Sequence, residues 1–500
     1  MNQIRPRLLI AGTGSGSGKT TMTSAILSAL KLLGKSPIAF KCGPDFIDLM
    51  FHREVTGIPC RNLDLFLMKE ATVRSTLHNH GQSFDLSLIE GVMGLYDGID
   101  DEGTASANAV SLVTGTPVLL VVNVHGKGLS VCAEIFGFLK FMPNRVQGIL
   151  LNHCPDGLVA YYRSMIQERL ELPVVGALPA IPEAEIGSRH LGLITAAEIS
   201  DLRQKLDRLG QAALQGVNWD LFFAIAAGAD RLDPRETMAE TEPILPEGRD
   251  RSGVGSGTTN AAGDDPVSAE GDRPLRIGIS RDEAFCFYYQ DNLDLLETMG
   301  AQLVFFSPLH EPALPDHLDG LILWGGYPEL HARTLSENQG MLQALRTGSQ
   351  SGLPIYAECG GFMVLHKAIR TPSGEEYPMA GVFPGITRMT DSLQDFGYAR
   401  LTANADNLLL PRGAVIPAHS FHHSVSDDPG DCFTAVKAGS GRSYPAFRQT
   451  RQTLAGYPHL LWSDNPEAVS RFLAACRVYQ TEQAPFRASA AATAAAHSHS

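Results

Sequence analysis

One glycine-rich segment constrains the possible fold of this chain more than any other. Gly12–Thr21, with the sequence GTGSGSGKTT, directly follows the apolar run Leu8–Ala11. A strand that enters such a turn and continues as a helix directs several backbone N–H groups toward one concavity, which suits a polyphosphate. The segment therefore predicts a nucleotide-binding P-loop, although five residues rather than four separate Gly12 from Gly18. The residues expected to hold the nucleotide are Gly14, Gly16, Gly18, Lys19, Thr20 and Thr21.

A flexible Gly/Ser linker is the plain alternative for this segment. A linker, however, needs neither a buried strand before it nor the Gly-Lys-Thr-Thr sequence that leads into the expected helix Met22–Leu33. In a P-loop, the Lys19 side chain adds positive charge beside the phosphates, and the Thr20 hydroxyl is suited to bind Mg²⁺. The interpretation as a P-loop is therefore the better one.

Length, charge and cysteine usage narrow the class of protein. A chain of 500 residues is too long for one core, so two or more domains are expected. The net charge of −14 argues against a nucleic-acid partner, because nucleic-acid phosphates would be repelled. The longest apolar runs, such as Pro117–Val122, are strand-sized and too short to cross a membrane. Eight scattered cysteines without a Cys-x-x-Cys pair indicate reduced thiols and a cytoplasmic location.

Apolar runs alternate with helical patterns along residues 1–232, which predicts a doubly wound α/β domain with its ligands at the carboxyl ends of the strands. The expected strands are Arg7–Ala11, Pro37–Lys41, Leu86–Ile89, Pro117–Asn123, Val146–Leu151 and Val174–Ala177. Residues 233–273 have the composition of a disordered linker. A second α/β domain is expected over 274–478, followed by a disordered Ala-rich tail over 479–500.

A second reactive centre is expected at Cys359. It lies where the apolar segment Pro354–Ala357 is expected to turn sharply into a helix, and the helix dipole at such a corner favours a thiolate. A buried structural cysteine is the alternative, but the flanking glycines favour a nucleophile. The backbone N–H groups expected to form an oxyanion hole belong to Gly325, Gly326 and Gly360. Spacing alone leaves two candidate clusters for the base, one at His459 and one at His422 and His423.

Taken together, the two halves resemble the cobyrinic acid a,c-diamide synthases, which are ATP- and glutamine-dependent amidases of tetrapyrrole carboxylates. Their first domain is similar to dethiobiotin synthetase, and their second is a class I-type glutaminase. The resemblance extends from about Leu8 to Phe472, interrupted by the linker. The matching blocks are Phe40–Asp48, Arg61–Asp64, Ile89–Gly98, Ser188–Leu193, Asp282–Phe285, Phe306–Leu309, Gly325–Glu329 and Glu358–Gly361.

The resemblance assigns roles to particular residues. It implies that Cys359 is the glutaminase nucleophile and His459 its base, with His422 as a pocket or structural residue. Ordinary class I glutaminases carry a Glu two residues after this histidine, whereas this chain has Leu461, so a Cys–His dyad is implied. In the first domain, Thr20 and Glu90 are expected to bind Mg²⁺. Asp45, Asp48 and Asp97 are expected to line the substrate and nucleotide pocket.

The implied reaction is amidation of the a and c acetate groups of a tetrapyrrole, with cobyrinic or hydrogenobyrinic acid as the leading substrate. ATP would convert a carboxylate to an acyl phosphate, and ammonia from glutamine would then attack it. Asn123 stands where relatives usually have Asp, and such departures keep sirohaem and nickel-sirohydrochlorin as alternative substrates. A more distant alternative is an ATPase switch of the ParA/MinD type, which shares the P-loop but has no use for Cys359.

Overall fold

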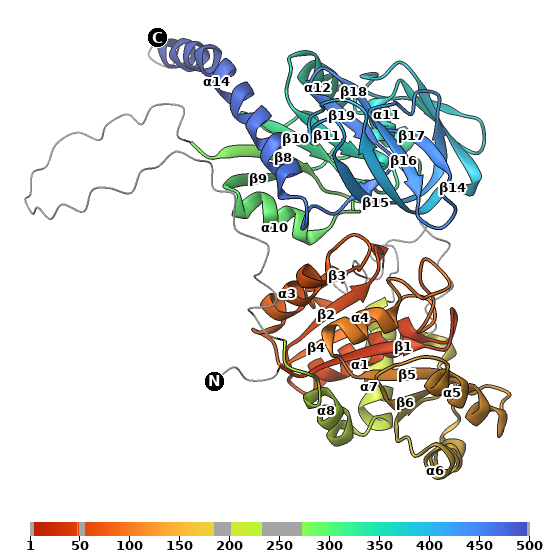
Figure 1. Cartoon of the computed structure of the whole chain (residues 1–500). Coiled ribbons are helices and arrows are strands. Elements are labelled where there is room, and N and C mark those ends of the chain that lie inside the picture. Colours follow the sequence, from red (N-terminus) through yellow and green to blue (C-terminus); the bar gives the residue numbers. More distant parts are fainter. Residues whose placement is uncertain (1–4, 48, 50–55, 185–201, 233–272, 498–500) are drawn as a thin grey trace, which may run out of the picture.

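The computed structural model describes residues 5–47, 49, 56–184, 202–232 and 273–497, with side chains up to residue 485. It contains two domains, drawn from red to olive and from green to blue in Figure 1. The expected linker 233–273 lies almost entirely outside the described residues, as does Asp48. Within the described part of the chain, no helix combines the length and the apolar character that crossing a bilayer requires.

The first domain is built on a seven-stranded sheet with strand order β3-β2-β4-β1-β5-β6-β7, in which every pairing is parallel. The strands are β1 (Arg7–Gly12), β2 (Pro37–Cys42), β3 (Cys60–Leu63), β4 (Leu86–Glu90), β5 (Val118–Asn123), β6 (Val146–Asn152) and β7 (Val174–Leu178). Six of them lie where the apolar runs predict strands. The short β3 was not predicted, because its sequence CRNL has no apolar run.

Helices cover both faces of this sheet (Figure 1). They are α1 (Lys19–Leu32), α3 (Glu70–Gly81), α4 (Ala107–Thr114), α5 (Ser130–Phe141), α6 (Val159–Leu170), α7 (Leu202–Gly216) and α8 (Trp219–Ala227). Neighbouring residues of a strand point to opposite faces, and both faces of β1 are covered: Leu9 packs into one core cluster and Ile10 into the other. This is the predicted doubly wound architecture.

The second domain begins with another mostly parallel sheet, in the order β18-β19-β11-β10-β8-β9. Its strands are β8 (Leu275–Ser280), β9 (Ala301–Phe306), β10 (Gly320–Leu323), β11 (Ile355–Glu358), β18 (Arg448–Thr450) and β19 (Thr453–Gly456). Its helices are α10 (Gln290–Thr298), α11 (Ala332–Glu337), α12 (Gln339–Gln350), α13 (Gly360–Leu365) and α14 (Pro466–His497). Separate apolar clusters lie on the two faces of this sheet, so the second domain is also doubly wound.

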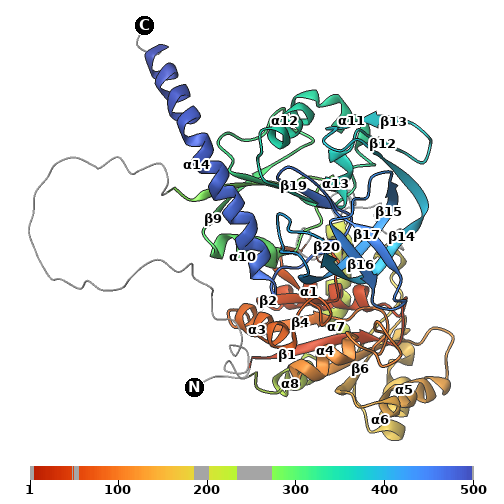
Figure 2. The same cartoon turned by 45° about the horizontal axis from the view of Figure 1, so that its top comes forward.

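A second, largely antiparallel sheet accompanies this parallel one and was not predicted. It consists of β12 (Ala368–Arg370), β13 (Glu376–Pro378), β14 (Ile386–Ala403), β15 (Val415–Ser426), β16 (Phe433–Lys437), β17 (Ser443–Ala446) and β20 (His459–Leu460). The long strands β14 and β15 carry many half-exposed polar residues, so they lack the apolar runs by which the other strands are found. Figure 2 shows β14 to β17 beside the parallel sheet, and in Figure 1 β15 lies at the edge of the second domain that faces the first domain.

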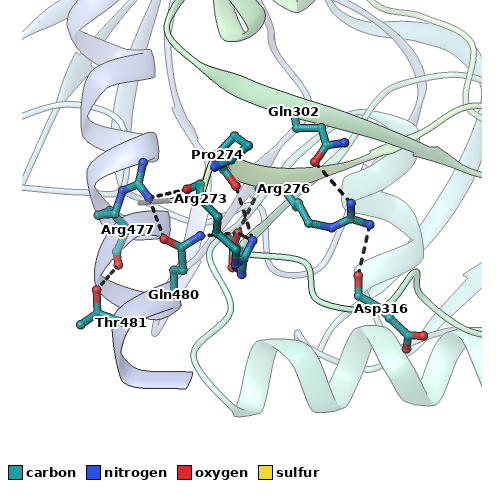
Figure 3. A network of polar contacts seen from close by, with 9 residues as sticks. Arg273, Pro274, Arg276, Gln302, Asp316, Arg477, Gln480 and Thr481 are labelled. Atoms are coloured by element: carbon teal, nitrogen blue, oxygen red, sulfur yellow. Dashed lines mark hydrogen bonds and ion pairs between the residues drawn. The ribbon is translucent and has the colours of Figure 1, made fainter. Parts of the chain in front are cut away.

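The expected disordered tail is helical in the structure, because α14 runs from Pro466 through residue 497. Polar contacts hold this helix past the expected boundary at residue 478 (Figure 3). Gln480 is buried and donates a hydrogen bond to Asp319, while Arg477 donates one to the carbonyl of Arg273. Arg273 in turn pairs with Asp319. The second domain therefore extends at least to Gln480.

Candidate active sites

The P-loop lies at the centre of the first sheet, between β1 and α1. Gly18 has φ of +93°, a left-handed conformation that favours glycine, and it leaves α1 to begin at Lys19. A Cβ at Gly18 would collide with Asn152, whose side-chain amide donates to the carbonyl of Ser17 at 3.1 Å. The buried Lys19 side chain folds back over the loop, with Nζ 3.5 Å from the carbonyl oxygen of Gly14. The loop therefore has the predicted conformation, and Asn152 is a support that sequence reasoning missed.

Three polar side chains meet at the carboxyl edge of the sheet beside this loop. Thr20 Oγ1 lies 2.7 Å from Glu90 Oε1, and Lys41 Nζ lies 3.0 Å from the same oxygen. Glu90 is 1% exposed and Lys41 4% exposed, and the parallel register of β2 and β4 places them side by side. A buried carboxylate next to a buried ammonium compensates the desolvation of both charges. Thr20 and Glu90 were predicted together, whereas Lys41 was not assigned a role.

The predicted aspartates occupy loops that follow β2 and β4. Asp45 accepts a hydrogen bond from the backbone N–H of Ile47, and Asp97 accepts one from that of Gly94 at 2.7 Å. Gly94 packs against Gly14, so the Asp97 turn lies directly against the P-loop. Both carboxylates thus stabilise turns, which was the plain structural alternative, and their expected contact with substrate and nucleotide stays a prediction. Asp48 falls outside the described residues.

The second predicted centre lies at the carboxyl end of β11. Cys359 has φ of +46° and ψ of −103°, and its backbone N–H donates to the carbonyl of Gly456 on β19. A non-glycine residue with positive φ is strained, and such strain concentrates at functional sites. The turn places the cysteine at the first residue before α13. The predicted elbow therefore forms, with the sulfur-bearing residue at the helix N-terminus.

The predicted base reaches the cysteine from the second sheet. His459 begins β20, and its ring is 1% exposed. A Cβ built on Gly325 would lie 3.3 Å from Cys359 Cβ and 3.4 Å from His459 Nε2, so the two side chains flank this one glycine. The Nε2 atom is buried and has no hydrogen-bond partner within the described residues. Burial lowers the pKa of His459, but the adjacent Cys359 and the Glu358 carboxylate outweigh that effect and raise it.

The expected Cys–His pair omits a carboxylate that the structure places against the histidine. Glu358, the last residue of β11, has Oε2 2.9 Å from His459 Nδ1. Its other oxygen accepts hydrogen bonds from the backbone N–H of Leu460 at 3.0 Å and from the hydroxyl of Tyr356 at 2.6 Å. The expectation of a two-residue arrangement, drawn from Leu461, is therefore corrected. The usual position carries no carboxylate, but the position preceding the cysteine carries one.

The three glycines expected to supply the oxyanion hole come together around the cysteine. Gly325 and Gly326 follow β10, and a Cβ on Gly360 would lie 3.1 Å from the backbone nitrogen of Gly326. The same Cβ would lie 2.9 Å from the ring of Pro328, so this turn and the start of α13 pack closely. Two amide groups beside a nucleophile have the arrangement that stabilises a developing oxyanion.

The alternative histidine cluster lies nearby but is arranged differently. His422 stacks on Tyr457, with ring centroids 3.8 Å apart, and its Nδ1 lies 2.8 Å from the carbonyl of Ser424. His419 pairs with His459 across β15 and β20. Burial lowers the pKa of His422 to about 4 and that of His419 to about 3, so both rings are neutral near pH 7. Because its ring is engaged in packing and a backbone hydrogen bond, His422 has the geometry of a structural residue.

One loop of the first domain reaches the second centre directly. Phe46, just after β2, packs against the ring of His459 at 5.1 Å and against Tyr289 at 4.5 Å. Tyr289 donates to the carbonyl of Pro44 in the same loop. Since Asp45 stands between these contacts and Lys41 lies near the end of β2, one short segment joins the surroundings of both centres.

Further polar contacts hold the two domains against each other. Arg61 on β3 donates to Asp291 at 2.9 Å and to Asp294 at 2.6 Å, both on α10. Tyr398 on β14 lies 2.6 Å from Asp64, and burial raises the pKa of that carboxyl group. These pairs fix the orientation in which the carboxyl edge of the first sheet faces the second domain.

A cavity of about 370 Å³ opens beside the P-loop at the carboxyl ends of β6 and β7. Its walls include Thr21, His125, Asn152, His153, Leu178 and Pro179. A larger cavity of about 490 Å³, lined by Ser28, Lys31 and Arg203 among others, lies away from both centres. The cavity of about 370 Å³ is the better candidate for a ligand pocket, because it adjoins the P-loop. It also lies at the carboxyl ends of the strands, where doubly wound sheets bind their ligands. Apart from Thr21, its lining residues were not predicted.

Comparison with known proteins agrees with both halves of this architecture. Residues 8–194 match the CobQ/CobB/MinD/ParA nucleotide binding domain, and residues 276–467 match the CobB/CobQ-like glutamine amidotransferase domain. The cobyrinate a,c-diamide synthase of Listeria innocua is 34% identical over 477 residues, covering 94% of this chain and 99% of that protein. Those of Listeria monocytogenes and Synechococcus sp. are 37% and 36% identical, covering 84% and 94% of this chain and 87% and 98% of those proteins. This chain belongs to the cobyrinate a,c-diamide synthase family.

Proposed function

We propose that this protein amidates the a and c acetate side chains of cobyrinic acid, using ATP to activate each carboxylate and glutamine as the source of ammonia. Full-length similarity to synthases of this name supports the reaction. The observation that carries the proposal is the loop after β2, which contacts His459 through Phe46 and begins two residues after Lys41, beside the P-loop. Ammonia that is released at one centre and consumed at the other requires the two centres to lie close together.

In the first domain, the P-loop backbone and Lys19 are proposed to bind the triphosphate of ATP. The Thr20 hydroxyl and the Glu90 carboxylate are oxygen donors of the kind that Mg²⁺ prefers, and they lie together at the start of α1, so they fit a Mg²⁺ site. Bound there, Mg²⁺ would neutralise phosphate charge. Lys41 adds a second positive charge at the same edge, where the substrate carboxylate would take the terminal phosphate and release ADP.

In the second domain, the Cys359 thiolate is proposed to attack the side-chain amide of glutamine. The oxyanion that develops would be held by the backbone amides of Gly326 and Gly360. His459 takes the thiol proton at Nε2 and gives it to the leaving ammonia, which leaves a glutamyl thioester. Water then cleaves the thioester, and His459 serves as its base, so that glutamate and the free thiol are regenerated.

Ammonia must remain unprotonated to attack the acyl phosphate, which then releases phosphate and yields the amide. The contacts of Phe46 with His459 and Tyr289, and the bond from Tyr289 to Pro44, support direct transfer between the domains rather than through bulk water. Asp45 and Asp97 are proposed to face the substrate and nucleotide at this junction, and the cavity beside Thr21 and Asn152 would receive the base of ATP.

A mass-spectrometric assay tests the proposal and identifies the substrate. The purified protein would be incubated with Mg²⁺-ATP, glutamine and one of four tetrapyrroles: cobyrinic acid, hydrogenobyrinic acid, sirohaem or nickel-sirohydrochlorin. We expect conversion of two carboxylates to amides on cobyrinic acid. Conversion of sirohaem or nickel-sirohydrochlorin alone would retain the mechanism and replace the substrate. ATP hydrolysis without any amide product would contradict the proposed reaction.

A further inference from the structure

The Glu358 side chain is buried at the end of β11, and hydrogen bonds to both of its oxygens fix its orientation. The side chain is 1% exposed, and its two oxygens divide three hydrogen bonds between them. Oε1 accepts from Leu460 N–H at 3.0 Å and from the Tyr356 hydroxyl at 2.6 Å, which leaves Oε2 directed at His459 Nδ1, 2.9 Å away. A buried carboxylate is costly unless such partners compensate it.

We propose that Glu358 is the positioning residue of the glutaminase centre. It orients His459, a role that in ordinary class I glutaminases belongs to a carboxylate two residues after the histidine. The inference rests on the proposed roles of Cys359 as nucleophile and His459 as base. Glu358 does not touch glutamine; it acts through His459.

The contact between Glu358 and Nδ1 selects the tautomer of His459. A neutral imidazole carries one proton, and a carboxylate can only accept a hydrogen bond. The Glu358 contact therefore places that proton on Nδ1 and leaves the lone pair on Nε2, the atom that faces the cysteine without any other hydrogen-bond partner within the described residues. Only this tautomer can take the proton of the Cys359 thiol.

Glu358 also balances the charge that His459 acquires during the reaction. When His459 takes the thiol proton it becomes an imidazolium, which needs a negative neighbour in this buried site. The titratable groups described around His459 are Cys359, Glu358, His419 and His422, and the two other histidines are neutral near pH 7. Tyr356 and Tyr289 adjoin Glu358, and burial raises the pKa of both phenols, so both are neutral as well. Asp45, next to Phe46, and Glu329, near Tyr457, are further carboxyl groups of this region. Among the described residues, Glu358 is the carboxylate that is hydrogen-bonded to the His459 ring, so it is the one placed to balance the imidazolium.

The sharpest test is Glu358→Gln, because the surrounding donors dictate how the new amide must lie. Leu460 N–H requires an acceptor, so the amide oxygen takes the Oε1 position and the NH₂ group faces His459 Nδ1. That NH₂ group would donate to Nδ1 and move the ring proton to Nε2, which is the wrong tautomer. The corresponding change in serine proteases lowers kcat by about 10⁴-fold. We therefore expect glutamine hydrolysis to fall by about 10³-fold or more.

Two companion variants separate positioning from structure. Glu358→Asp keeps the charge on a shorter side chain and should restore part of the lost rate. Tyr356→Phe is the matched control: it removes one hydrogen bond to Glu358 but leaves both the carboxylate and its bond to His459. It should therefore lose far less activity than Glu358→Gln. All variants would be compared as full-length protein, with glutamate release as the primary readout, so the result does not depend on which tetrapyrrole is the substrate.

Two further readouts distinguish a positioning role from a structural one. Alkylation of Cys359 by iodoacetamide, followed against pH by peptide mass spectrometry, should shift to higher pH in Glu358→Gln, because the imidazolium that stabilises the thiolate is lost. Ammonia-dependent amidation should stay at the wild-type rate, since the first domain is unchanged. Wild-type glutamine hydrolysis in Glu358→Gln would overturn the proposal, as would an unchanged alkylation profile. Equal loss with glutamine and with ammonia would instead assign Glu358 a structural role and overturn the proposal too. If alkylation and substitution of Cys359 left glutamine hydrolysis intact, the proposed function itself would fail.

Discussion

Replacement of Gly325 by alanine tests the geometry of the glutaminase centre with a single methyl group. The added Cβ would lie 2.5 Å from His459 Cε1 and 3.3 Å from Cys359 Cβ, whereas carbon atoms in contact are normally about 3.5–4.0 Å apart. The ring cannot give way freely, because Glu358 holds Nδ1 and Phe46 packs against the ring. His459 or the turn after β10 must therefore shift by about 1 Å to restore normal contact.

The size of this shift determines the expected loss of activity and of stability. Misplacement of a catalytic group by 1 Å costs about a hundredfold in rate, so glutamine hydrolysis by Gly325→Ala should fall by about two orders of magnitude. Overpacking of a buried site costs about 1–3 kcal/mol, so the free energy of unfolding should decrease by a similar amount without loss of the fold. Ammonia-dependent amidation should be unchanged, because the first domain contains no new atom.

The assay compares amide formation with glutamine and with ammonium salts in the same preparation. Gly137→Ala is the matched control: Gly137 lies in α5, and a Cβ there meets no atom within 4 Å. It should leave both rates unchanged and, since alanine favours helix over glycine, raise stability by up to about 1 kcal/mol. Wild-type glutamine hydrolysis by Gly325→Ala would refute the reasoning, because His459 would then function without the position that the structure gives it.

Three other predictions address the remaining parts of the site. Cys359→Ala should abolish glutamine-dependent amidation and spare ammonia-dependent amidation in the same mass-spectrometric assay; loss with both nitrogen donors would contradict the two-centre scheme. Lys19→Ala should stop amidation while some glutamine hydrolysis, followed as glutamate release, persists; full amidation would refute its phosphate-binding role. Burial lowers the pKa of His422 from 6.5 to about 4, so the unfolded chain takes up that proton first as pH falls. The free energy of unfolding is therefore highest above pH 6.5, as far as His422 determines it, and falls by about 1.4 kcal/mol per pH unit between pH 6.5 and about 4. His422→Gln should flatten this part of the plot of unfolding free energy against pH. An unchanged slope in that variant would show that other groups cause the pH dependence.

The sequence is most informative where function depends on contiguous residues. Apolar runs identified six of the seven strands in the first sheet, because strands buried on both faces are apolar throughout. The short β3 and the antiparallel strands β14 and β15 were missed, since half-exposed strands stabilised by their neighbours carry polar residues. The expectation of a disordered tail failed for a related reason: tertiary contacts of Arg477 and Gln480 hold α14 past that boundary.

The sequence by itself determined two turns, the P-loop and the turn at Cys359, around which the two centres are built. The glycines and Lys19 after β1, and Cys359 between β11 and α13, indicate these two turns locally, although Asn152 and Gly456 support them from distant parts of the chain. The tertiary structure alone decided what surrounds them. His459 meets Glu358 across 101 residues of chain, and Lys41 meets Glu90 across 49. Such encounters depend on strand order and register, which the whole set of packed strands settles together, so no local pattern around either residue encodes them.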